Sequence, residues 1–260
     1  MLSKSTDSSE TIKPRRKFRR TIAAIPTIFT IGNIFCGFYS IISVQHGNYD
    51  LAAKLIGWAA VFDILDGRIA RLTKTTSEMG LQLDSLADVI SFCLAPAILI
   101  NAWAFSQFQP LGWIVSFIYI ICGAMRLARF NVMGPGHKDF VGMPTPAAGG
   151  MVASLVHFYA LPEAVQDQMI FVIFGLVGGL AFLMISKIRY IGFKNPARGN
   201  SYATVLFLAL LVTSIYFYSR VVLLFLASLY ALSGITMKTY SFLGRRFGSR
   251  SRVEQLPEKS

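Results

Sequence analysis

The sequence predicts an all-α fold, a polytopic membrane helical bundle of about eight transmembrane helices with both termini cytoplasmic. Of its 260 residues, 54% are hydrophobic and 15% are charged, and the mean hydropathy is +0.54, so the chain is more apolar than a soluble globular domain. Apolar runs of about 20 residues recur, which is the length of a membrane-spanning helix. Lysine and arginine residues gather in alternate connecting segments, as is typical of cytoplasmic loops.

The apolar runs begin after a polar and basic segment. Residues 1–20 are expected to form a cytoplasmic tail, because the apolar stretch from Thr21 is too long for a signal-peptide core and no small-residue cleavage site closes it early. A membrane-embedded domain is expected over residues 21–238, and residues 239–260 are expected to form a second basic cytoplasmic tail. The predicted spans are 22–45, 50–72, 78–104, 110–130, 144–161, 168–188, 202–218 and 220–238.

The distribution of positive charge predicts the orientation of these spans. With both termini in the cytoplasm, Lys54 and Arg220 are the only ones of the 25 Lys and Arg residues on the opposite side. The connection between the second and third spans then faces the cytoplasm, in a protein expected to reside in the cell inner membrane. The net charge of +12 fits anionic membrane lipid better than nucleic acid, because the basic residues flank apolar spans and no nucleic-acid recognition module is visible.

Four aspartates interrupt the apolar pattern around that second connection. Each charge at the centre of a membrane helix costs about 2.5–3.5 kcal/mol, so such residues need compensation. Residues three or four apart are neighbours on a helix, which places Asp63 and Asp66 on one face, and Asp84 and Asp88 on one face of the next helix. The turn between the helices is expected to bring these two rows together.

An all-carboxylate cluster without His or Cys predicts Mg²⁺ or Mn²⁺ rather than zinc. A pair of such ions activates an attacking hydroxyl and stabilises a phosphoryl group during transfer. Gly67 and Gly80 leave room for a phosphate or nucleotide near the backbone, and Arg71 suits a phosphate contact. Two alternatives remain: the aspartates are loop charges paired with nearby Arg and Lys residues, or they line the pathway of a cation transporter.

The same region resembles a family signature. Residues 63–71 read Asp-Ile-Leu-Asp-Gly-Arg-Ile-Ala-Arg, and Gly80, Asp84 and Asp88 follow at the family's spacing, so the chain resembles the CDP-alcohol phosphatidyltransferases. In that family an alcohol attacks the phosphate of a CDP-linked lipid and CMP is released. The resemblance implies a homodimer with two ions, Mg²⁺ or Mn²⁺, in each active site. It further implies that Asp88 is the general base and that the metal ligands are Asp63, Asp66, Asp84 and Asp88.

The resemblance also implies which residues contact the CDP part of the lipid: Asp66, Gly67, Arg71, Ser77 and Gly80. Asn33 is a further candidate from its own chemistry, because an amide in an apolar span near the cytoplasm can hydrogen-bond a nucleotide or its phosphate. Hydrogen bonding between helices explains Asn33 equally well.

The flanking segments point to the acceptor alcohol. Four stretches, 25–38, 126–131, 140–148 and 186–190, resemble the serine-using branch of the family, the CDP-diacylglycerol–serine O-phosphatidyltransferases. The expected substrates are therefore CDP-diacylglycerol and L-serine, with glycerol 3-phosphate, inositol phosphate or choline as alternative acceptors. Arg126 and Arg129 share a helical face, and a guanidinium can bind the serine carboxylate through two hydrogen bonds. Both residues fit topology-setting charge equally well.

Overall fold

The structure, a computed structural model, describes residues 15–73, 77–133, 140–159, 167–190, 221 and 224–231. Within this part of the chain the prediction of a helical fold is confirmed, apart from two strands of two residues each. The predicted span 202–218, most of span 220–238 and the tail 239–260 lie outside the described residues. Helix α1 begins at Arg15, inside the segment expected to be the N-terminal tail, since Lys and Arg are good helix formers.

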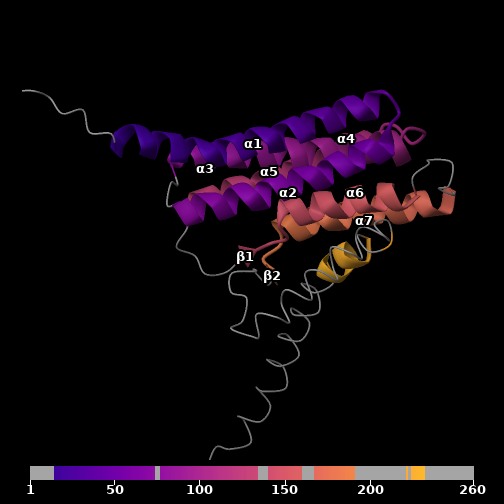
Figure 1. Ribbon diagram of the computed structural model, residues 1–260. Coiled ribbons are helices and arrows are strands. Elements are labelled where there is room, and N and C mark those ends of the chain that lie inside the picture. Colours follow the sequence, from indigo (N-terminus) through magenta and orange to yellow (C-terminus); the bar gives the residue numbers. More distant parts are fainter. Residues whose placement is uncertain are drawn as a thin grey trace, which may run out of the picture.

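The helices run side by side, with α6 and α7 together along one side of the others (Figure 1). Helix α2 packs along α1 and α6, and α5 packs on α7. The elements in chain order are α1 (Arg15–Gln45), α2 (Tyr49–Thr73), α3 (Glu78–Asp88), a π-helical turn (Val89–Leu94), α4 (Ala95–Ala104), α5 (Leu111–Met133), β1 (Phe140–Val141), α6 (Thr145–Tyr159), α7 (Asp167–Ile185) and β2 (Arg189–Tyr190).

Three helical stretches in the described residues are long and apolar enough to cross a membrane: Pro26–Gln45, Glu78–Ala104 and Leu111–Met133. Helix α2 has 25 residues, but aspartate and arginine residues occupy its C-terminal half. The apolar stretch Met169–Ile185 of α7 is shorter. The expected count of about eight spans therefore remains a prediction, and three spans are supported by length and composition.

A tight turn folds α2 back along α1. Gly47 has φ +74°, and the backbone N–H groups of Gly47 and Asn48 donate to the carbonyls of Val44 and Ser43, each at 2.9 Å. A glycine with positive φ after the last helical residue is the usual helix stop of this kind. The resulting α1–α2 pair is close, and the Ser40 hydroxyl donates to the Ala52 carbonyl at 2.9 Å inside it.

A short antiparallel pair of strands ties the start of α6 to the end of α7. Phe140 pairs with Tyr190, and Val141 with Arg189. Gly142 follows β1 with φ +87°, and a Cβ at this position would collide with the carbonyl oxygen of Met184. The strands lie at the end of the bundle where α2 ends (Figure 1), so they are close to the aspartate-bearing end.

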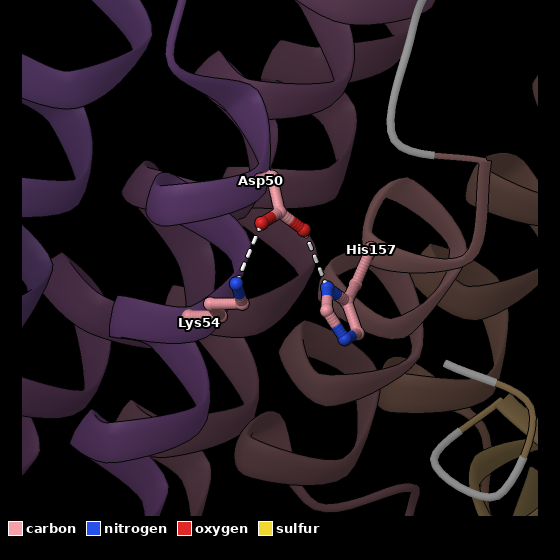
Figure 2. A network of polar contacts seen from close by, with 3 residues as sticks. All are labelled: Asp50, Lys54 and His157. Atoms are coloured by element: carbon pink, nitrogen blue, oxygen red, sulfur yellow. Dashed lines mark hydrogen bonds and ion pairs between the residues drawn. The ribbon is translucent and has the colours of Figure 1, made fainter. Parts of the chain in front are cut away.

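A polar cluster joins α2 and α6 at the opposite end of α2. Figure 2 shows Asp50 between Lys54 and His157, with Oδ2 2.7 Å from Lys54 Nζ and Oδ1 2.6 Å from His157 Nδ1. The His157 side chain is 7% exposed and that of Lys54 is 53% exposed. Because a carboxylate only accepts hydrogen bonds, Nδ1 of His157 is the donor.

Candidate active site

The two aspartate rows meet at the ends of α2 and α3. Asp63 and Asp66 lie in the C-terminal half of α2, and Asp84 lies on α3. Each offers a carboxylate oxygen, and these three oxygens lie within 4.8 Å of one another. Three carboxylates this close repel one another unless a cation lies between them, so the arrangement has the donor set of a divalent metal site.

Asp88 extends this group toward the interior. It lies one turn after Asp84 on α3, is 8% exposed, and interacts electrostatically with Asp63 and Asp84. Among the described residues, no hydrogen-bond partner reaches Oδ1 of Asp84 or Oδ1 of Asp88, and both atoms are buried. A buried carboxylate oxygen without a donor is costly, and a bound cation would compensate both. The residues therefore fit a divalent metal ion.

Helix α1 supplies a residue that sequence reasoning missed. The Thr30 hydroxyl donates to Asp66 Oδ2 at 2.9 Å, and the contact is buried. It fixes one oxygen of Asp66 and so orients the other. The signal available in the sequence was its position one turn before Asn33, on the same helix face.

Asn33 lies on that face of α1, fully buried. Among the described residues, neither Nδ2 nor Oδ1 of its amide has a hydrogen-bond partner, although its backbone carbonyl accepts from the Ser91 hydroxyl at 2.9 Å. The interhelical hydrogen bond that would explain this amide structurally is thus not formed by its side chain. An amide with both groups free has capacity for a ligand.

The candidate CDP contacts cluster around the connection from α2 to α3. Among the described residues, no atom lies within 4 Å of the position that a Cβ would take at Gly67, so there is room for an approaching group on this side of the residue. Ser77 is the N-cap of α3, and its hydroxyl accepts from the Gly80 N–H at 3.0 Å, which gives both residues a structural role at the start of α3. The side chain of Arg71 lies outside the described residues.

Arg126 and Arg129 have different surroundings although they share a helix face. Arg126 is 9% exposed; its Nη1 donates to Thr145 Oγ1 at 3.2 Å, and its charge interacts with Asp63 and Asp88. Nε of Arg126 is buried without a hydrogen-bond partner in the described residues. Arg129 instead donates from Nη1 to the carbonyl of Ile185 at 3.1 Å, at the C-terminus of α7, where a cation is favourable.

Comparison with known proteins assigns this arrangement to a family. Residues 23–232 match the sequence profile of the CDP-alcohol phosphatidyltransferases. The chain belongs to the CDP-alcohol phosphatidyltransferase family. The match covers every described element except the first residues of α1, and it includes the aspartates, Asn33 and both arginines.

Relatives of this CDP-alcohol phosphatidyltransferase include bacterial and archaeal proteins. The CDP-diacylglycerol–serine O-phosphatidyltransferase of Helicobacter pylori strain J99 is 37% identical over 65% of this chain and 73% of its own length. The enzyme of the same name from Bacillus subtilis is 35% identical over 68% of this chain and 94% of its own length. The archaetidylserine synthase of Methanothermobacter thermautotrophicus is 36% identical over 64% of this chain and 69% of its own length.

Proposed function

We propose that this protein transfers the phosphatidyl group of CDP-diacylglycerol to the hydroxyl of L-serine, giving phosphatidylserine and CMP. The observation that carries the proposal is the meeting of Asp63, Asp66 and Asp84, within 4.8 Å of one another, in a chain of the CDP-alcohol phosphatidyltransferase family. Serine as the acceptor is supported by the names of relatives that are 34–38% identical to this chain.

The carboxylates would hold two Mg²⁺ or Mn²⁺ ions. Hard cations prefer oxygen ligands, and the Oδ1 atoms of Asp84 and Asp88, to which no described residue donates, offer capacity for them. Such ions lower the pKa of a bound hydroxyl and neutralise charge on the phosphoryl group. The remaining ligands would be Asp63 and Asp66, with Thr30 holding the carboxylate of Asp66 in place.

In the proposed reaction, Asp88 accepts the proton of the serine hydroxyl. The hydroxyl oxygen forms a bond to the phosphorus that carries diacylglycerol, and the bond from this phosphorus to the oxygen of CMP breaks. Burial of Asp88 keeps competing water from the carboxylate, which favours transfer over hydrolysis of the lipid.

The CDP group would lie in the space beside Gly67 that a Cβ would otherwise occupy, with the start of α3 at Ser77 and Gly80 beside it and Arg71 near its phosphates. The amide of Asn33, which has no hydrogen-bond partner among the described residues, would donate to and accept from the CDP group. Its position one turn from Thr30 keeps this amide on the face of α1 that reaches Asp66.

Arg126 is the better candidate for the serine carboxylate. Its guanidinium is buried beside Asp88, and Nε has no hydrogen-bond partner among the described residues. A serine whose carboxylate binds there would have its hydroxyl near the general base. Thr145 steadies the guanidinium from α6. Arg129, whose Nη1 caps α7, would act on the site by holding α7 and the strand pair.

The lipid tails of the substrate would stay in the bilayer while the aspartates face the cytoplasm, as the distribution of Lys and Arg indicates. We place the protein in the inner membrane with both termini cytoplasmic, in about eight spans, as a homodimer. This orientation gives the site access to cytosolic serine and lets CMP leave into the cytosol.

The test is an assay of the purified protein in detergent with CDP-diacylglycerol, radiolabelled serine and Mg²⁺ or Mn²⁺. We expect label in phosphatidylserine, one CMP released for each lipid formed, and loss of both products when a chelator is added or CDP-diacylglycerol is omitted. Incorporation of glycerol 3-phosphate, inositol phosphate or choline in place of serine would overturn the acceptor assignment. Absence of CMP release with every acceptor would overturn the transferase proposal.

A further inference from the structure

The π-helical turn Val89–Leu94 begins directly after Asp88 and separates α3 from α4. The N–H of Ala95, the first residue of α4, donates to the carbonyl of Ile90, five residues earlier. A π-turn holds one residue more than an α-turn, so it rotates the helix before it relative to the helix after it by about 100°. The direction in which Asp88 points relative to α4 therefore depends on the geometry of this turn.

The turn has a local cause in the sequence. Pro96 lies in the first turn of α4 and has no N–H to donate to the carbonyl of Phe92, four residues earlier. The Tyr119 hydroxyl of α5 donates to this carbonyl instead, at 3.1 Å, and Tyr119 is 1% exposed. A neighbouring helix thus supplies the hydrogen bond that the irregular backbone lacks.

Three glycines from three helices contact consecutive residues of the turn. A Cβ at Gly37 of α1 would collide with the Ser91 hydroxyl and lie 2.9 Å from its Cα. A Cβ at Gly123 of α5 would collide with Cys93 Sγ.

On α6, a Cβ at Gly149 would lie 3.1 Å from both Cα and the carbonyl oxygen of Phe92. By contrast, a Cβ at Gly150, the next residue, would meet no atom of the described residues within 4 Å. The close approach of α6 to the turn is therefore made at one glycine and not at its neighbour. Three helices therefore pack closely against the turn.

From this packing we infer that Gly149, Gly123, Gly37 and Tyr119 are positioning residues, which hold the π-helical turn and through it fix the Asp88 carboxylate against the other aspartates. None of them touches the carboxylates; they act on the backbone that follows Asp88. The inference rests on the proposed role of Asp88. It adds that the position of this carboxylate depends on packing from α1, α5 and α6.

The test compares Gly149→Ala with Gly150→Ala in the purified full-length protein. Gly149→Ala displaces Phe92 by a few tenths of an ångström, and we expect kcat to fall about tenfold, because small misplacements of catalytic groups are costly. The dissociation constant for CDP-diacylglycerol and the thermal midpoint should change little. Gly150→Ala should match the wild type in all three measurements. Equal kcat values in the two variants would overturn the inference. It would also be overturned if the lipid affinity and the thermal midpoint of Gly149→Ala fell as far as its kcat.

A rescue experiment gives a second measurement. Gly123→Ala should lower kcat in the same way, and adding Cys93→Ala, which removes the colliding sulfur, should restore it. Failure of the rescue would argue against positioning through the turn.

If the wild type forms no phosphatidylserine, the proposed function fails, and the same variants are then compared by Mn²⁺ binding, measured by electron paramagnetic resonance. Weaker Mn²⁺ binding by Gly149→Ala than by Gly150→Ala would still support the inference, and equal binding would overturn it.

Discussion

Asp88 combines near-complete burial with an oxygen that no described residue donates to. If it is the general base, Asp88→Asn removes the proton acceptor while keeping the size of the side chain. We expect kcat to fall at least about a hundredfold, within the range usual for general bases, with CDP-diacylglycerol still bound. Steady-state assays and a lipid-binding titration measure the two effects.

The matched control is Glu78→Gln, which changes an exposed carboxylate at the start of the same helix and should leave turnover unchanged. Near-normal turnover by Asp88→Asn would contradict its assignment as the general base.

Arg126 and Arg129 allow a second comparison three residues apart on one helix. Arg126→Gln should raise the KM for serine about tenfold or more, since a charge-assisted hydrogen bond is worth about 1.5–3 kcal/mol, and should change the KM for CDP-diacylglycerol less. Arg129→Gln should lower the thermal midpoint by releasing the Ile185 carbonyl and leave the serine KM near the wild-type value. A larger effect of Arg126→Gln on the CDP-diacylglycerol KM would count against a serine-carboxylate contact.

At this scale the sequence could predict which aspartates share a helix face, because three- and four-residue spacing is a local property. It could not separate Arg126 from Arg129, since both lie on one face and their partners, Thr145 and Ile185, are distant in the chain. Thr30 was missed for the same reason. Its bond to Asp66 joins residues 36 positions apart, and a threonine in an apolar helix carries no charge to draw attention.

Among the elements, the third predicted span contains a feature that hydrophobic periodicity does not predict. Residues 78–104 are helical, as expected, but the π-helical turn in the middle was not predicted, because a single extra residue in a turn leaves an apolar run unchanged. Pro96 was the available signal. The strand pair β1–β2 was also unexpected; two residues per strand are too few for an alternating pattern, and the pairing depends on Gly142.

The contact between α2 and α6 gives a prediction at the level of elements. His157→Ala removes the buried donor to Asp50 shown in Figure 2, and we expect a loss of about 1.5–3 kcal/mol in stability, the usual contribution of a hydrogen bond to a charged group. Lys54→Ala removes the exposed partner on the same carboxylate and should cost at most about 1 kcal/mol. Thermal unfolding in detergent compares the two variants. A larger effect of Lys54→Ala would show that the buried contact does not hold the helices together.

For the molecule as a whole, the meaning of the aspartate site depends on α2 crossing the membrane. Its 25 residues extend about 38 Å as an α-helix, more than the hydrocarbon thickness of about 30 Å, and its charged residues near Asp63 and Asp66 would lie at one surface. The turn at Asn48, before α2, and Glu78, after it, should then face opposite sides of the membrane. The Lys and Arg distribution predicts that Glu78 is on the cytoplasmic side.

Single cysteines at these two positions test the orientation, in a background with Cys36, Cys93 and Cys122 replaced by alanine. Both residues are exposed, so each introduced thiol is reachable. We expect a membrane-impermeant maleimide to label Asn48→Cys in intact cells and Glu78→Cys only after the membrane is opened. The reverse pattern would place the aspartates outside, away from cytosolic serine. Labelling of both positions in intact cells would mean that α2 does not cross the membrane, and the orientation inferred from the Lys and Arg distribution would then be wrong.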